Sequence, residues 1–498
     1  MLVKRGRVGC LHLAREGTTL AVKNAAAPQL CRAGSTLFST GAYNRGRANK
    51  GPRLVQNHKT LHYNVDTKTL KKMNESVSFS SLGSRFVKHL LPNDYKTSVP
   101  PNYIEYSKIY ALGAFASSAA MVLSTQSLLY AVGLGAGAIP LSAAINWVLK
   151  DGLGQLGGVL FTSLVNNKFD SDPKRWRIVA ALSVDGAMYL EALTPLFPAL
   201  FLPLAAIANT GKSVSWLAAS ATRAGIHLSF AKKGNLADIT GKAGSQGVVA
   251  STAGNFFGIF LSPFVGSDPY NILACVVALS AVHLGSMYRA LGYVSLNTLN
   301  MQRGEIVTRR YLESCGGGEE RKLQSITPES VGGEEVILGR NLNYLCTGFD
   351  SNLIVGPPIE EVCIAMSTRG GNNQKGEDKF EIFLKNLRIQ KFAVFGYGNS
   401  NNKTEHIKVG LYFDHSASTK DMLKGYLISM HYVKSLEADA GRDRTVDNKI
   451  LLEKSHLLGD QMIDDYVLQL ESNGWNVDNI YIDEKNMGRL SQSISSDD

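Results

Sequence analysis

Four long stretches of the chain contain no Asp, Glu, Lys or Arg. The longest has 41 residues, between Lys108 and Lys150, and is interrupted by a turn-forming segment at Gly133–Pro140. The other three have 20, 25 and 20 residues and occupy positions 192–211, 243–267 and 269–288. About 20 uncharged residues in a helix cross the hydrocarbon core of a bilayer, so each short stretch is long enough to span once and the longest twice.

A further apolar tract, Ile178–Leu190, has Asp185 as its single charge. Together these stretches predict a mainly α fold, a polytopic membrane bundle of about six helices followed by a small α+β C-terminal domain. A soluble helical bundle is the alternative, because the segments are rich in Gly, Ala and Ser. The six helices are expected near 109–131, 141–165, 178–198, 202–222, 245–266 and 270–290.

The charges between these segments alternate. Basic residues precede the first segment, fill the connections 166–177 and 223–242, and follow the last. The connections 133–140 and 194–203 carry no charge, and 267–269 carries one acid. Basic loops favour the side from which segments insert, so this alternation predicts six spans with both ends on one side.

The net charge of +10 comes entirely from residues 1–60, which hold eleven basic side chains and only Glu16 as an acid. The remaining basic and acidic residues balance, which leaves no basic face for nucleic acid. A basic, acid-poor start predicts an organelle transit peptide or a disordered basic arm, with a mitochondrial membrane as the expected location and a plastid as the alternative. The six cysteines include no C-x-x-C pair, so we expect no disulfide framework, metal site or cofactor.

The sequence Lys150–Gly158 contains the spacing G-x-G-x-x-G of dinucleotide-binding loops. Such a loop follows a buried strand, whereas this one continues an apolar helix-like stretch. Gly154 and Gly158 instead form a G-x-x-x-G pair, which predicts a helix-packing face.

Charged and polar groups within the apolar segments are the candidate functional residues, either as ion pairs that fix helix register or as a ligand or ion pathway. Adjacent helical residues do not face each other, so Lys150 and Asp151 are not expected to neutralise one another. We expect His283 to be a satisfied core histidine. The full candidate set is Lys150, with Asp185 and Glu191 as possible partners, Asp151, with Arg223 as a possible partner, and Gln155.

Five segments resemble the root UVB sensitive family, whose shared region matches from about residue 86 to 305. They are "LPNDYKTSVPPNYIEY" (91–106), "VLSTQSLLYAVGLGAGAIPLSAAINWVLKDGLGQLGGVLF" (122–161), "DSDPKRWRIVA" (170–180), "LEALTPLFP" (190–198) and "GNLADITGKAGSQG" (234–247).

This resemblance implies a membrane-associated organellar protein connected with vitamin B6 homeostasis, ultraviolet-B tolerance and seedling development. Some members act as a pair of paralogues, and no catalytic residue set carries over. The loop 170–180 also resembles, weakly, a loop of major facilitator transporters, of which six spans would be one half. A lone half would need a second copy or a paralogue to enclose a path, so we expect an oligomeric partner. The predicted spans make membrane lipid the other expected partner.

From Glu305 the composition becomes that of a soluble protein. We expect linkers and loops over 306–378 and a small α+β domain over 379–498, with strands at 379–398, 406–413 and 479–483 and helices at 418–436 and 447–472. Ser418 is the expected helix cap.

The expected function is therefore that of a non-enzymatic membrane protein acting as a scaffold or as part of a transport assembly. The alternatives are a soluble helical adaptor and an enzyme acting on a pyridoxal-type cofactor, in which Lys150 would form a Schiff base.

Overall fold

The computed structural model describes residues 53–56, 59–64, 69–72, 89–133, 140–165, 168–316, 326–337, 352–360, 373–397, 408–440, 448–482 and 489–490. The chain forms two units, Met1–Ser78 and Phe79–Asp498. In the first unit, β1 (Arg53–Gln56), β2 (Lys59–Asn64) and β3 (Thr69–Lys72) form an antiparallel sheet in the order β1-β2-β3. Strand β1 and the start of β2 lie within residues 1–60, where we expected a transit peptide or a disordered basic arm, and residues 1–52 lie outside the described residues.

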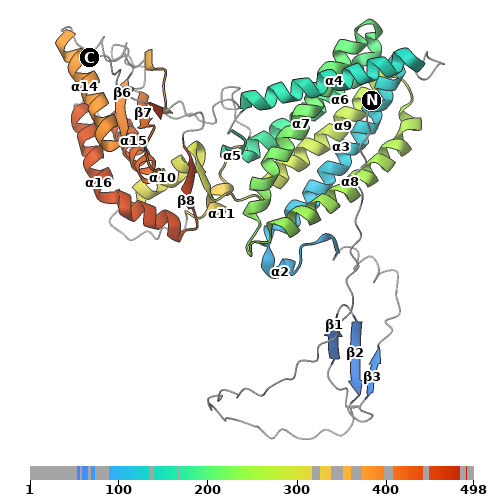
Figure 1. The fold of residues 1–498 in the computed structure, drawn as a ribbon, viewed down its shortest axis with the longest axis horizontal. Helices are drawn as coiled ribbons and strands as arrows, with labels where there is room; N and C mark the ends of the chain where they lie inside the picture. Colours follow the sequence, from blue (N-terminus) through green and yellow to red (C-terminus); the bar gives the residue numbers. More distant parts are fainter. Residues whose placement is uncertain are drawn as a thin grey trace, which may run out of the picture. The chain divides into compact units, whose positions relative to one another are not determined.

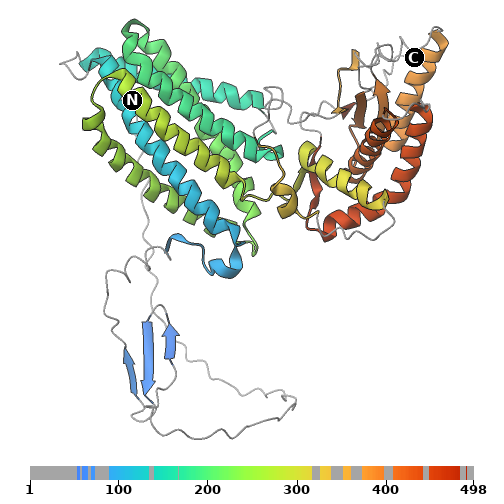
Figure 2. The same cartoon turned by 180° about the vertical axis from the view of Figure 1, so that it is seen from behind.

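Six long helices form the first part of the second unit (Figures 1 and 2). They overlap all six segments expected to be helical. Their bounds are α3 (Asn102–Val132), α4 (Pro140–Val165), α6 (Pro173–Leu193), α7 (Phe201–Ser229), α8 (Leu236–Val265) and α9 (Pro269–Leu291). The short helix α2 (Tyr95–Ser98) precedes them, and the short elements between them are α5 (Lys168–Ser171), η1 (Thr194–Leu196) and η2 (Pro198–Leu200).

Two of these helices begin with the same local sequence, Asp followed by Pro. Asp172 precedes Pro173 and accepts a hydrogen bond from the backbone N–H of Arg175 at 3.4 Å. Asp268 precedes Pro269 and accepts one from the N–H of Asn271 at 3.2 Å. Proline suits the first helical position, and the aspartate satisfies a backbone donor that the helix leaves free, so α6 and α9 begin where the sequence dictates.

Helix α3 packs against α8, α9 and α6, and α7 packs against both α6 and α4. The contact of α8 with α3 depends on Gly254 and Gly258, because a side chain at Gly254 would overlap the backbone carbonyl of Phe115. A Cβ at Gly258 would lie 2.8 Å from the carbonyl oxygen of Ala119. This second G-x-x-x-G pair lets the two backbones approach closely.

The outer surface of this helical part is apolar. Of the 34 large hydrophobic side chains that are exposed among the described residues, 27 lie between Leu112 and Tyr288. On α8 alone, Phe256 is 70% exposed and Phe264 is 76% exposed. Four helices, spanning Asn102–Val132, Pro173–Leu196, Leu236–Val265 and Pro269–Leu291, are long and apolar enough to cross a membrane.

The chain continues through β4 (Thr298–Asn300), α10 (Met301–Gly316) and α11 (Pro328–Gly332). A sheet then forms from β5 (Leu353–Val355), β7 (Lys408–Asp414) and β6 (Phe392–Tyr397), in that order, with β9 (Arg489–Leu490) also paired to β7. Strand β6 is antiparallel to β7, whereas β5 and β9 are parallel to it. A separate parallel pair joins β4 to β8 (Asn476–Tyr481).

Three helices accompany these strands: α14 (Asn373–Gln390), α15 (Thr419–Ala440) and α16 (Asn448–Ser472). A buried cluster that includes Tyr311, Phe413, Tyr426 and Trp475 joins α10, β7, α15 and the end of α16. Helix α15 begins as expected, with the backbone N–H of Asp421 donating to Ser418 Oγ at 3.2 Å.

Two predictions for this region are wrong. Residues 379–390 belong to helix α14 and not to a strand, because Phe383 and Leu387 lie four residues apart and are buried on one helix face. The linkers and loops expected over 306–378 are helical at both ends, because residues 306–316 belong to α10 and α14 begins at Asn373.

The close approach of α8 and α3 makes a first prediction. Gly254→Ala should destabilise the protein in detergent, because the added methyl group overlaps the α3 backbone. Gly247→Ala is the matched control on the same helix, since nothing lies within 4 Å of a Cβ there and alanine favours a helix by up to about 1 kcal/mol. Thermal unfolding of both variants measures the difference; equal midpoints would contradict the packing described.

Candidate functional site

Ionised side chains lie inside the helical part, under its apolar surface. Asp185 on α6 and His283 on α9 are 1% and 4% exposed. Nδ1 of His283 lies 2.9 Å and 3.1 Å from the two carboxylate oxygens of Asp185. The contact joins α6 to α9 and gives the buried carboxylate a hydrogen-bond partner, without which its burial would be costly.

A second pair joins three helices. Glu191 is the third residue from the end of α6 and is 1% exposed. Its carboxylate accepts hydrogen bonds from Nζ of Lys212 on α7 at 2.7 Å and 2.6 Å. Oγ of the buried Ser124 on α3 donates to the same carboxylate at 2.8 Å. A buried charge is tolerated when it is both paired and hydrogen-bonded, and Glu191 meets both conditions.

The third pair corrects a prediction. Nζ of Lys150 lies 2.6 Å from Oδ1 of its neighbour Asp151, so the two residues do neutralise each other. The long lysine side chain folds back beside the helix, where its Nζ also lies 4.4 Å from the centre of the Trp147 ring. Nδ2 of Asn209 on α7 donates to the same Asp151 oxygen at 3.2 Å.

The proposed partners of this pair are also wrong. Asp185 and Glu191 pair with His283 and Lys212, and not with Lys150. Arg223 is exposed near the end of α7. It lies more than three helical turns beyond Asn209, the residue of α7 that contacts Asp151. Gln155 is exposed on α4 and joins none of these pairs in the described residues.

Glycines bring α4 close to this polar region. Gly154 is buried, and a side chain there would overlap Asn209; a Cβ at Gly158 would lie 2.9 Å from Ser213. Without these close contacts α4 could not present Asp151 to Asn209. The dinucleotide-like spacing of the sequence therefore lies within a helix, at its contact with α7.

The three pairs form a series across the helices. Asp185 and Glu191 are six residues apart, about 9 Å along α6. Lys212 and Asn209 are three residues apart on α7 and so lie on one face of that helix. The three pairs thus lie on α9, α6, α7 and α4, with each acid paired to a base and Asn209 beside Asp151. Among the described residues no group of three His, Cys, Asp or Glu could hold a metal ion.

A separate ionic cluster was not anticipated from the sequence. Glu335 is shared by Lys174 at the start of α6 and Arg303 on α10, whose Nη1 donates to it at 2.7 Å. Arg303 is completely buried and also donates to the backbone carbonyl of Ser171 at 3.2 Å. Burial raises the pKa of the Glu335 carboxyl, but Arg303 and Lys174 lower it further, so its pKa lies below the ordinary value.

The segment "DSDPKRWR" contains the signal that could have revealed this cluster, since five charged residues stand at the start of an apolar helix. Glu335, the partner of Lys174, lies more than 160 positions further along the chain in a segment with the composition of a linker. No local pattern connects the two.

The region that carries these pairs matches a known family. Residues 77–315 match the vitamin B6 photo-protection and homoeostasis domain. The chain is 30% identical to the protein root UVB sensitive 2, chloroplastic, of Arabidopsis thaliana over 394 residues, which are 79% of this chain and 82% of that protein. The chain belongs to the root UVB sensitive family.

Two other members of the root UVB sensitive family match over shorter lengths. Root UVB sensitive 3 of Arabidopsis thaliana is 33% identical over 261 residues, 52% of this chain and 58% of that protein. RUS family member 1 of Dictyostelium discoideum is 31% identical over 244 residues, 47% and 46% of the two chains. This chain thus spans about half the length of these two relatives, and no solved structure matches it.

The ionic cluster gives the second prediction. Glu335→Gln leaves Lys174 and Arg303 buried without a counter-charge, which should cost about 3–5 kcal/mol at pH 7. Glu334→Gln is the matched control one residue away, because Glu334 is 53% exposed and its contact with Arg310 contributes about 0–1 kcal/mol. Chemical unfolding at pH 7 compares the two; similar losses would show that the shared carboxylate is unimportant.

The same carboxylate predicts a dependence on pH. Because the pKa of Glu335 is lowered in the folded state, its contribution is present above the pKa of an unfolded glutamate, about 4.3, and is lost as the pH falls through the lowered value. Unfolding curves between pH 7 and pH 3 should therefore show a smaller loss of stability on acidification for Glu335→Gln than for the unmodified chain. A parallel decline of both would contradict this assignment.

Proposed function

We propose that this protein of the root UVB sensitive family is a non-enzymatic organellar membrane protein that spans a bilayer six times. One observation carries the proposal: many large apolar side chains of the helical part are exposed along its long helices, while Asp185, Glu191 and His283 are buried inside it and paired. Water as the solvent would favour the reverse distribution, whereas hydrocarbon favours this one. Apolar surface of this extent marks contact with a membrane or with other chains.

The alternation of basic and uncharged connections supports an orientation. The start of α3, the turn between α5 and α6, the turn between α7 and α8 and the end of α9 would share one side of the membrane. The turns after α3, α6 and α8 would lie on the other. One relative carries the word chloroplastic in its name, which supports a plastid membrane as the location; the comparisons give no support to the mitochondrial location expected from the N-terminal composition.

Within vitamin B6-related homeostasis, which the name of the matched domain indicates, we propose that the protein is part of a transport assembly. The support is the set of acid–base pairs His283–Asp185, Glu191–Lys212 and Lys150–Asp151, which lie on four helices within the helical part. Ionisable groups in that position usually serve a pathway for an ion or polar solute. The second role that the geometry favours is a scaffold, in which the pairs only hold the helices in register.

The membrane proposal predicts the accessibility of introduced cysteines in a variant without native cysteines. In organelles, a water-soluble maleimide should label Asp170→Cys and Lys233→Cys from one side and Ala199→Cys and Ser267→Cys from the other. Phe256→Cys should resist labelling until detergent is added. All five positions are exposed in the structure, so rapid labelling of Phe256→Cys in organelles would instead favour a soluble helical protein.

Transport and scaffold roles differ in what the Glu191–Lys212 pair must provide. Lys212→Met alone leaves a buried carboxylate unpaired and should abolish rescue of a deletion strain in either role. The double variant Glu191→Gln, Lys212→Met leaves no buried charge unpaired. It should therefore restore the amount of protein to that of the unmodified chain. If the pair lies on a transport pathway, rescue still fails; if the pair only fixes register, rescue returns. Arg223→Gln, an exposed charge on the same helix, is the control that should rescue fully.

A further inference from the structure

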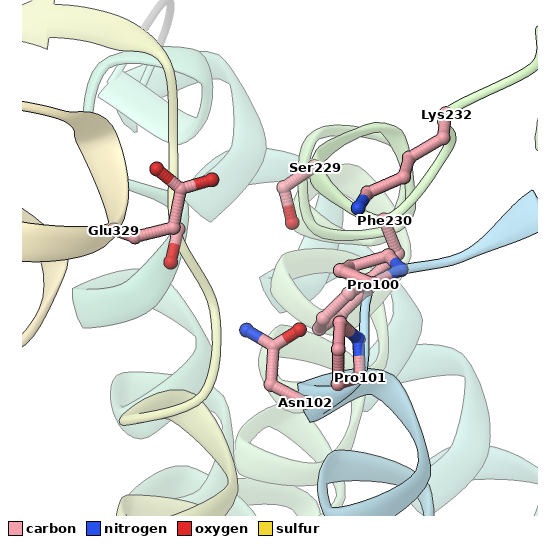
Figure 3. Close-up of a pocket in the computed structure, with 8 residues that line it drawn as sticks. Pro100, Pro101, Asn102, Ser229, Phe230, Lys232 and Glu329 are labelled. Atoms are coloured by element: carbon pink, nitrogen blue, oxygen red, sulfur yellow. The ribbon is translucent and has the colours of Figure 1, made fainter. Parts of the chain in front are cut away.

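A cavity of about 340 Å³ lies at the polar ends of three helices, apart from the ionised pairs inside the helical part. Its wall includes the start of α3, the end of α7 and the segment that follows it, the backbone after α9, and α11. Figure 3 shows its lining residues, with Glu329 facing Ser229, Asn102 and the two prolines across an open space. Cavities of this size hold small ligands.

The cavity carries one charge of each sign on different walls. Lys232 follows α7, and Glu329 lies on α11. Within the described part of the chain neither side chain has an ion-pair partner in the structure, whereas their charged neighbours are engaged elsewhere. Nζ of Lys233 donates to Thr97 Oγ1 at 3.1 Å, and Glu334 pairs with Arg310.

The uncharged groups of the cavity indicate the kind of atom that would complete it. Nδ2 of Asn102 donates to the backbone carbonyl of Tyr293 at 2.7 Å, while its Oδ1 is buried and accepts no hydrogen bond among the described residues. Oγ of Ser229 already donates to the carbonyl of Ile226 at 2.8 Å, so it can only accept another hydrogen bond. A ligand with an N–H group would satisfy these acceptors and the Glu329 carboxylate.

The other end of the cavity favours an anion. Lys232 supplies a positive charge, and Pro101 directly precedes α3, a helix of 31 residues whose start has no side-chain cap. The start of a helix carries a partial positive charge. Pro100, Pro101 and Phe230 provide apolar surface between the two ends, and Phe230 is held in place by its contact with Tyr103, at 5.3 Å between ring centres.

We propose that this cavity binds a small zwitterion, a molecule with a primary amine and an anionic group such as phosphate on a short frame. The amine meets Glu329 and Asn102 Oδ1, and the anionic group meets Lys232 and the start of α3. A quaternary amine has no N–H to donate, so the cavity discriminates against it. This chemistry has two sources, the phosphoethanolamine headgroup of a bilayer lipid and a soluble phosphorylated amine.

Binding of O-phosphoethanolamine to the full chain in phosphatidylcholine nanodiscs tests the proposal by isothermal titration. Lys232→Gln and Glu329→Gln should each weaken binding at least about tenfold, because each removes a charge-assisted hydrogen bond. Lys233→Gln, a charge of the same sign next to the cavity, should bind as the unmodified chain does. Phosphocholine should bind at least about tenfold more weakly than phosphoethanolamine.

Two results would overturn the proposal. One is the absence of measurable phosphoethanolamine binding by the unmodified chain at millimolar concentration. The other is inorganic phosphate binding as tightly as phosphoethanolamine, with Glu329→Gln unchanged, which would leave an anion site without an amine site.

The composition of the nanodisc identifies the source of the ligand. If phosphatidylethanolamine in the disc reduces the binding of added phosphoethanolamine, a lipid headgroup occupies the cavity. Unchanged binding in such discs assigns the cavity to a soluble zwitterion. In both cases the cavity recognises the amine and the anion together. Neither result depends on whether the acid–base pairs inside the helices serve transport.

Discussion

An ionised side chain removed from water needs an opposite charge or several hydrogen bonds within reach, and the helical part of this protein is organised around that requirement. Asp185, Glu191 and Lys150 each meet it through a contact to another side chain, and two of these contacts cross between helices. The helices can therefore adopt only arrangements in which every pair is closed. Apolar packing, which fits many arrangements equally well, would not select one of them.

The glycines have a complementary role. Small residues on α4 and α8 let neighbouring backbones approach until there is no space for a side chain. In the membrane that we propose around these helices, the outer apolar side chains gain little by associating, so close packing and polar contacts would hold the helices together. The polar pairs determine which helices are neighbours, and the glycines determine how near those neighbours lie.

The positions of the helices could be predicted from the sequence because the information is local. Uncharged length located five of them and an apolar tract with the single charge Asp185 located the sixth, and Asp-Pro pairs mark the starts of α6 and α9. The partners of the charged residues could not be predicted, since they depend on which helix faces which. The Lys150–Asp151 contact was missed for a different reason: the rule that adjacent residues diverge holds at Cβ, and a lysine side chain is long enough to overcome it.

The C-terminal region shows the limits of pattern reading in a second way. Residues 379–390 alternate like a strand, but they also repeat with the helical spacing that buries Phe383 and Leu387, and short apolar tracts satisfy both patterns. For the candidate site, the sequence identified the buried acids of α6 correctly as unusual. It contained no sign of Lys212 as a partner, or of the cavity beside Asn102.

The carboxylate of Glu335 has a consequence for biosynthesis. The ribosome releases a chain from its N-terminus, so Lys174 and Arg303 both emerge before the residue that neutralises them. Until residue 335 has been made, the first turn of α6 and the start of α10 lack their common counter-ion and keep contact with water. The helices of the nascent protein thus reach their final arrangement only after translation has passed well beyond the last of them.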